Sequence, residues 1–160
     1  MMWFAKQFLG EIEMKSRKGF TLVELMVVIF IVGILAAVAI PIMRGRIDSA
    51  KWSEGRAGAG SIRSAARAFC AEKGPNWGGV WGNVTLANLG FTITLGAGVG
   101  GGDLDGKYFT DDAYAIQFNG YDDYLVTVTA VNSTSADKPT TPAVVTLDEN
   151  GAWVVDGVAE

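Results

Sequence analysis

A single carboxylate interrupts an otherwise apolar stretch near the start of this chain of 160 residues. Between Phe20 and Met43, polar side chains occur at Thr21 and Glu24. A charged side chain in a membrane helix is costly, and it is usually paired or functional. Glu24 is therefore the residue whose type and position most strongly indicate chemistry. A cation on an adjacent helix is the partner that would compensate its charge at low dielectric.

Two simpler explanations for Glu24 stay open at this point. In the first turn of a helix, a carboxylate offsets the positive end of the helix dipole. The side chain could also lie at the boundary between lipid and water. Neither explanation fully compensates the charge when helices bundle away from water, so pairing across helices is the favoured interpretation.

The apolar run Leu25–Met43 is about long enough to cross a bilayer as a helix. Lys15, Arg17 and Lys18 precede it and, by the positive-inside rule, hold that end in the cytoplasm. The alternative is an ordinary secretory signal, for which residues 37–39 would supply a small-x-small cleavage site. Such signals have a shorter apolar core, of about 7 to 15 residues. We therefore expect a segment that stays attached as a membrane anchor.

The composition argues against an enzyme. The sequence has no histidine, which removes the commonest general base and every Ser-His or Cys-His nucleophile pair. One cysteine, Cys70, cannot form an internal disulfide. Residues 44–73 carry seven basic and three acidic side chains, whereas residues 74–160 carry two basic and eleven acidic ones. The acidic C-terminal region argues against nucleic acid as a partner, because phosphate binding needs a cationic surface.

A second helical stretch, residues 44–74, is predicted to be polar with a narrow apolar stripe. The residues of the stripe recur at helical spacing. They are Ile62, Ala65, Ala66, Phe69, Cys70 and Lys73, of which Lys73 contributes the aliphatic part of its side chain. Gly55, Gly58 and Gly60 each cost about 1 kcal/mol relative to alanine, which is tolerable where a neighbour packs closely. Gly74 followed by proline predicts the helix end.

Residues 75–160 are expected to form a long loop followed by an antiparallel sheet of about four strands. The β-forming segments are Tyr114–Phe118, Tyr124–Val131, Ala143–Leu147 and Ala152–Val155, with shorter strands at Thr92–Leu95 and Trp81–Thr85. Asn150-Gly151 predicts a hairpin between the last two. The expected fold class is α+β: a long N-terminal helix, with a transmembrane half (20–43) and an amphipathic half, packed on a small C-terminal antiparallel sheet.

The segment from Lys18 to Glu24 reads K-G-F-T-L-V-E. It resembles the K-G-F-T-L-x-E signal of type IV pilins and of the related pseudopilins of type II secretion. The resemblance is strong over residues 15–43, looser as far as Lys73, and architectural beyond it. It implies that residues 1–19 are a leader peptide, or that Met14 is the true start. It also implies the pilin fold for the whole chain.

The resemblance further implies how the chain is processed. A prepilin peptidase would cleave between Gly19 and Phe20 and methylate the new amine of Phe20. Glu24 would then pair with the Phe20 amine of a neighbouring subunit. Gly33 and Pro41 would bound a segment that can lose helical structure in filaments. The implied partners are further copies of the chain in a helical filament, the peptidase, an inner-membrane assembly platform and the membrane itself.

The function implied by the resemblance is that of a major pilin, the structural subunit of an extracellular type IV pilus. Before assembly, the subunit would reside in the inner membrane. A pseudopilin of a type II secretion system, in a periplasmic pseudopilus, is the first alternative. A minor pilin or adhesin that acts as a binding module is the second. Pro41 and the lack of a clear calcium motif favour the pilus.

Weaker signals lie in the C-terminal region and on the second half of the helix. No cofactor is expected, although Asp103, Asp105, Asp111 and Asp112 could gather around Ca²⁺, which prefers clustered carboxylates. The alternative is a solvated acidic loop. Three arginines could pair with acidic residues of neighbouring subunits or form a solvated face: Arg56, Arg63 and Arg67. Five aromatic residues could form either core contacts or a ligand surface: Trp77, Trp81, Trp153, Tyr114 and Tyr121.

Overall fold

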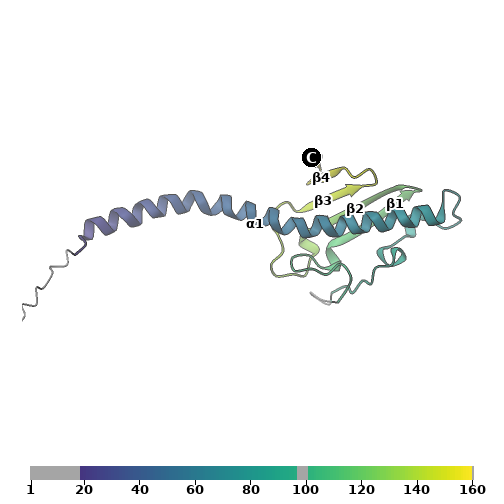
Figure 1. Cartoon of the computed structure of the whole chain (residues 1–160), viewed down its shortest axis with the longest axis horizontal. Helices are drawn as coiled ribbons and strands as arrows, with labels where there is room; N and C mark the ends of the chain where they lie inside the picture. Colours follow the sequence, from purple (N-terminus) through teal and green to yellow (C-terminus); the bar gives the residue numbers. More distant parts are fainter. Residues whose placement is uncertain (1–18, 97–100, 160) are drawn as a thin grey trace, which may run out of the picture. The chain divides into compact units, whose positions relative to one another are not determined.

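The structure is a computed structural model that describes residues 19–96 and 101–159. Its first element is α1, a helix over Leu22–Lys73 that contains Pro41 (Figure 1). The chain divides into two compact units, residues 1–40 and residues 41–160, so the boundary falls within α1. The described part of the first unit consists of residues 19–40, which are mostly helical. The expected α+β fold, a long helix followed by an antiparallel sheet, is confirmed.

In the second unit, α1 packs on the sheet along one buried stripe. The predicted stripe is confirmed at Ile62, Ala66 and Cys70, which are at most 2% exposed. It also extends towards the N-terminus by about three turns, as far as Trp52. Ala65, Phe69 and Lys73, at the margins of the stripe, are half-buried. The helix therefore covers the sheet over a longer surface than the apolar residues of the sequence indicate.

Glycines in α1 allow two aromatic rings of the second unit to approach the helix backbone. A Cβ atom added at Gly58 would lie 2.5 Å from Tyr114 Oη, and one added at Gly55 would lie 2.9 Å from Phe109 Cε2. Nothing lies within 4 Å of the corresponding position at Gly60. The expectation of close packing is thus confirmed at Gly55 and Gly58 and is wrong at Gly60.

The helix ends at Lys73, as predicted. Gly74 follows in the left-handed conformation, with φ of +70°, and its N–H donates to the carbonyl oxygen of Cys70 at 2.9 Å. This geometry is common after a helix because glycine adopts it without steric cost.

The loop that follows contains short 3₁₀ helices, and neither of the two short strands predicted in it is present. They are η1 (Trp81–Asn83), η2 (Leu86–Leu89) and η3 (Asp111–Ala113). The strand predicted at Thr92–Leu95 is absent because carboxylates take up its backbone donors. Thr92 N–H donates to Asp103 Oδ2 at 2.7 Å, and Thr94 N–H donates to Asp111 Oδ2 at 2.8 Å. At 81–85, Val84 N–H closes a 3₁₀ turn onto Trp81, so this strand prediction is also wrong.

The sheet is antiparallel, with its strands in sequence order. The strands are β1 (Tyr114–Gly120), β2 (Asp123–Thr129), β3 (Val144–Asp148), β4 (Trp153–Val155) and β5 (Val158–Ala159). The first four lie where the sequence predicts them, whereas β5 was not expected. The predicted second strand ran too far, because η4 (Ala130–Asn132) begins directly after Thr129. Gly151, with φ of +94°, turns the chain between β3 and β4, which confirms the predicted hairpin.

Candidate assembly site at the start of the apolar helix

The first turn of α1 is closed by reciprocal hydrogen bonds between Thr21 and Glu24. The backbone N–H of Thr21 donates to Glu24 Oε2 at 3.0 Å, and the Thr21 hydroxyl donates to the same oxygen at 2.9 Å. In return, the backbone N–H of Glu24 donates to Thr21 Oγ1 at 3.2 Å. This arrangement is a capping box, in which Thr21 precedes the helix and Glu24 is its third residue.

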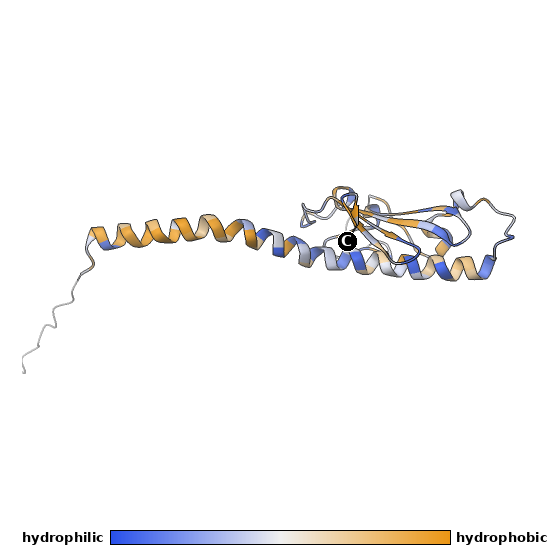
Figure 2. Ribbon diagram, turned by 90° about the horizontal axis from the view of Figure 1, so that it is seen from above, coloured by the Kyte–Doolittle hydropathy of each residue, from blue (hydrophilic) through white to orange (hydrophobic). Residues whose placement is uncertain are grey.

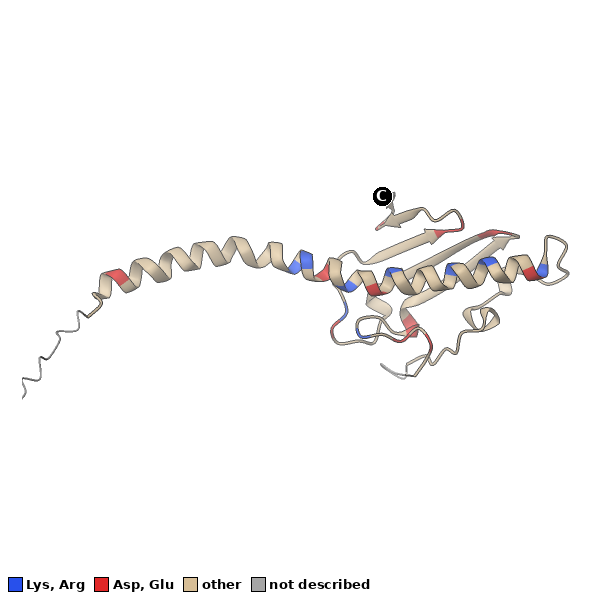
Figure 3. Ribbon diagram, in the orientation of Figure 1, with Lys and Arg blue, Asp and Glu red and all other residues tan. Residues whose placement is uncertain are grey.

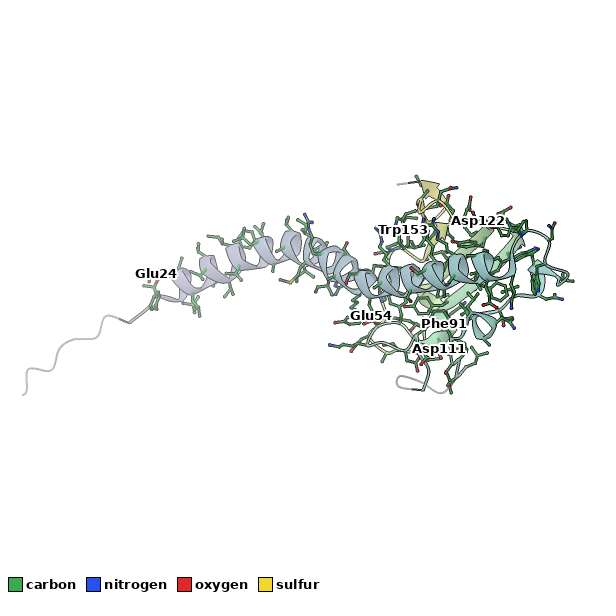
Figure 4. All side chains as sticks on the ribbon, turned by 45° about the vertical axis from the view of Figure 1, so that its right-hand side comes forward. Glu24, Glu54, Phe91, Asp111, Asp122 and Trp153 are labelled. Carbon is green, nitrogen blue, oxygen red and sulfur yellow. The ribbon has the colours of Figure 1, made fainter. Side chains whose placement is uncertain are left out.

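The capping box gives Glu24 a local role that our reading of the sequence missed. The signal was present, because a threonine followed three residues later by glutamate before an apolar run predicts such a cap. Among the described residues, the hydrogen bonds that Glu24 accepts all reach Oε2. Its second carboxylate oxygen, Oε1, accepts no hydrogen bond from the described residues. Figure 4 labels Glu24 at this end of the helix.

Gly19 and Phe20 precede the helix and are both exposed. The Phe20 side chain is 85% exposed, and nothing lies within 4 Å of a Cβ position at Gly19. No described residue therefore shields the Gly19 side of the peptide bond between these two residues. In the uncleaved chain the Phe20 nitrogen belongs to this bond, so cleavage is needed to make it an amine. Met14 and the basic residues of the expected leader lie outside the described residues.

The part of α1 that follows Glu24 is apolar, as the orange colour in Figure 2 shows, and its residues are mostly exposed. Leu25, Phe30 and Met43, for example, are 60%, 69% and 66% exposed. Within the described residues, α1 is the helix long and apolar enough to cross a membrane, with a mean hydropathy of 3.1 over its best 18-residue window. Gly33 and Pro41 both lie within α1 and are exposed. An apolar surface of this extent normally contacts lipid or other helices.

Farther along α1, in the second unit, Asp48 anchors a distant loop. It is 9% exposed, and its Oδ2 accepts hydrogen bonds from the Thr140 hydroxyl at 2.7 Å and from the backbone N–H groups of Thr140 and Thr141 at 3.1 and 3.2 Å. The hydrogen bond from the Thr140 hydroxyl, with those from the two N–H groups, holds the pKa of Asp48 below its usual range. Trp52 adds a second anchor, since its indole Nε1–H donates to Pro142 O at 3.1 Å.

Glu54 anchors a second loop in a similar way. Its Oε1 accepts the backbone N–H groups of Tyr108 and Phe109, both at 2.8 Å, and its Oε2 accepts that of Lys107 at 3.2 Å. Figure 3 shows acidic and basic residues interspersed along the part of α1 in the second unit, with other acidic residues on the loops and strands of that unit. No local pattern could have predicted either anchor, because the partners are more than 50 residues away in the chain.

The four aspartates considered as calcium ligands accept hydrogen bonds from the backbone of their own loop. Asp105 accepts the N–H of Gly101 at 2.6 Å and that of Asp111 at 2.8 Å, while Asp111 accepts the N–H of Leu104 at 3.0 Å. Asp103 and Asp112 accept N–H groups of the preceding loop segment. In the described part of the chain, no group of three acidic, histidine or cysteine side chains could hold a metal ion. Calcium binding stays a prediction.

Two of the three arginines considered for subunit contacts touch the hairpin formed by β3 and β4 of their own chain. Arg63 donates to the carbonyl oxygen of Glu149 through Nε at 3.3 Å and through Nη2 at 3.0 Å. The guanidinium of Arg56 lies 5.3 Å from the centre of the Trp153 ring. Arg67 is exposed. Cys70 is 2% exposed, and burial raises the pKa of its thiol, so it is not an accessible nucleophile.

Comparison with known proteins agrees with the geometry of the helix start. Residues 14–40 match the family model described as the prokaryotic N-terminal methylation motif. The chain is 43% identical to the fimbrial protein EcpC of Eikenella corrodens over 58 residues, which is 36% of this chain and 38% of that protein. It is 40% identical to fimbrial protein Q of Moraxella bovis over 85 residues, covering 52% of this chain and 53% of that one.

A third relative is the type IV major fimbrial protein FimA of Dichelobacter nodosus, which is 49% identical over 53 residues, or 32% of this chain and 34% of FimA. The matches thus span about half of these relatives' length or less. No solved structure gives a significant match. The chain is thus similar to type IV fimbrial proteins over its N-terminal region, and its long helix followed by an antiparallel sheet is a pilin-like arrangement.

Proposed function

We propose that the chain is the major structural subunit of an extracellular type IV pilus, which polymerises through α1 after its leader is removed. The observation that carries this proposal is the position of Glu24. It stands in the first turn of an exposed apolar helix, directly after the expected cleavage site, and keeps one carboxylate oxygen without a partner among the described residues.

Cleavage between Gly19 and Phe20 by a prepilin peptidase would convert the Phe20 nitrogen into an amine, which methylation would leave cationic. Within the same chain, the hydroxyl and N–H of Thr21 already occupy Glu24 Oε2. A neighbouring helix, shifted along the filament axis, could then present its own Phe20 amine to Oε1. Opposite charges attract strongly in a low-dielectric bundle, so this pairing would let the apolar helices associate away from water.

Before assembly, the subunit would lie in the inner membrane, with α1 as its anchor and an assembly platform as its partner. The apolar surface of α1 is then covered first by lipid and later by other copies of the chain. The name of one relative, the type IV major fimbrial protein FimA, favours a pilus over a pseudopilus or a minor pilin. The three relatives described above are named as fimbrial proteins, which favours a structural role over an enzymatic one.

Substitution of Glu24 by glutamine tests this proposal. Glutamine keeps an oxygen that can accept the hydrogen bonds of Thr21, so the helix start is preserved while the charge is removed. We expect Glu24→Gln and Glu24→Ala to be cleaved normally and to form no filaments. Filaments of normal number and length from Glu24→Gln would refute charge pairing.

Two control variants separate processing and capping from pairing. Gly19→Val should accumulate as an uncut precursor on a gel, because a side chain is introduced at the cleaved bond. Thr21→Val removes the hydroxyl but leaves the charge of Glu24 intact, and it should still yield filaments. A Thr21→Val variant as defective as Glu24→Gln would indicate that helix capping, rather than pairing, is the role of Glu24.

A further inference from the structure

A pocket of about 420 Å³ lies in the second unit, between the last turns of α1 and the loop that follows the helix. Its size falls within the range of small-molecule sites, about 300 to 1,000 Å³. Two of its side chains, Phe69 and Lys73, come from α1. The others come from residues 77–88, and Trp77, Asn83 and Asn88 are those that bear on its chemistry.

The aromatic wall of the pocket is fixed by packing. The ring of Trp77 meets Phe69 edge-on, with 5.5 Å between ring centres, and meets Trp81 with 4.9 Å between centres. A Cβ atom added at Gly79 would overlap the Trp77 indole, so a larger residue there would require the indole to move. Trp81 is supported in turn by Phe118, at 5.9 Å. Trp77 stays half-buried, so its orientation is set and part of its surface is open.

The polar groups of the pocket include two asparagine amides. Asn83 is exposed, and its side chain makes no hydrogen bond with the described residues. Asn88 accepts the backbone N–H and the hydroxyl of Thr85 through Oδ1, both at 2.8 Å, which fixes its amide and leaves its Nδ2 hydrogens available. The cation of the pocket, Lys73, is paired with Glu72 at 2.7 Å. The site therefore offers neutral donors and acceptors beside an aromatic wall.

We propose that this pocket binds a neutral saccharide. One sugar ring packs its C–H face against Trp77, while its hydroxyl groups exchange hydrogen bonds with the amides of Asn83 and Asn88. An amide both donates and accepts, which matches a pair of neighbouring hydroxyls. The pairing of Lys73 with Glu72 disfavours an anionic ligand. The aliphatic lining is limited to Val80 and Val84, which disfavours a lipid.

The test is a titration of the ¹⁵N-labelled, uncleaved full chain in detergent with lactose and, separately, with cellobiose. The indole signal of Trp77 and the side-chain amide signal of Asn83 should shift and saturate with a dissociation constant on the order of 1 mM. Asn83→Ala removes up to two hydrogen bonds and should weaken binding about fivefold or more. Asn76→Ala changes an exposed asparagine that does not line the pocket, so it should bind like the parent chain.

Two results would overturn the proposal. One is the absence of saturable shifts with both sugars at about 50 mM, roughly fifty times the expected dissociation constant. The other is binding that Asn83→Ala and Asn76→Ala affect equally. Trp77→Ala should abolish binding, but it also removes packing around Phe69, so Asn83→Ala is the deciding variant. Because the uncleaved chain is used, these results are independent of whether the protein forms pili.

Discussion

Replacing Gly58 by alanine sets helix propensity against packing, and the structure predicts which effect dominates. In an isolated helix, alanine would be favoured over glycine by about 1 kcal/mol. In the folded chain, the added Cβ atom would lie 2.5 Å from Tyr114 Oη and 2.7 Å from Cζ of the same ring. These distances are shorter than van der Waals contact, so the ring or the helix has to move.

The tyrosine cannot withdraw easily, because it is 6% exposed and packs near Phe109, with 6.3 Å between ring centres. Overpacking of a core typically costs about 1 to 3 kcal/mol. After subtracting the propensity gain of about 1 kcal/mol, Gly58→Ala should lower the free energy of unfolding by about 1 kcal/mol. Gly60→Ala meets no atom within 4 Å and should raise it by up to about 1 kcal/mol.

Thermal unfolding of the full chain in detergent, followed by tryptophan fluorescence, measures the difference. The two variants carry the same substitution two residues apart in one helix, so each controls for the other. We expect a gap of about 2 kcal/mol between them, which corresponds to several degrees in Tm for a unit of this size. If Gly58→Ala were as stable as Gly60→Ala, the close packing of Tyr114 on the helix would be refuted.

Two further predictions concern the carboxylates that anchor loops to α1. Asp48 has a folded pKa below its unfolded value, so its stabilising effect is present above about pH 4 and is lost as the pH falls through the folded pKa. Asp48→Asn should therefore lower Tm at pH 7, and its Tm should fall less than that of the parent chain between pH 4 and about pH 2. If the Tm of the variant fell as much as that of the parent chain over this range, the prediction would be contradicted. Glu54→Ala leaves three N–H groups without their acceptor and should cost about 1 to 3 kcal/mol in urea unfolding, whereas exposed Glu72→Ala should cost little.

The elements that the sequence predicts well are those defined by neighbouring residues. Runs of β-branched and aromatic residues correctly predicted β1 to β4. Asn150-Gly151 predicted the hairpin between β3 and β4, and Gly74 predicted the end of α1. The K-G-F-T-L-V-E segment predicted the similarity to type IV pilins that the comparisons found. Each of these signals is local, so the physics that acts on it does not depend on distant parts of the chain.

The features that the sequence did not reveal depend on distant partners. The stripe of α1 begins at Trp52 because Phe109 and Pro142, more than 50 residues away, provide its contacts. The strand predictions at Thr92–Leu95 and Trp81–Thr85 were wrong because β-propensity does not indicate which group accepts the hydrogen bond from each backbone N–H. Thr21 is the exception, since its cap on Glu24 could have been recognised from the spacing alone.

The most direct test of the account is the mass of the N-terminal peptide of the subunit, measured on filaments sheared from cells that express this chain. We predict long surface filaments, visible by electron microscopy, whose main subunit begins at N-methylated Phe20. A subunit that begins elsewhere, or a processed chain that is never found in filaments, would contradict the proposal that Glu24 and the Phe20 amine join neighbouring copies.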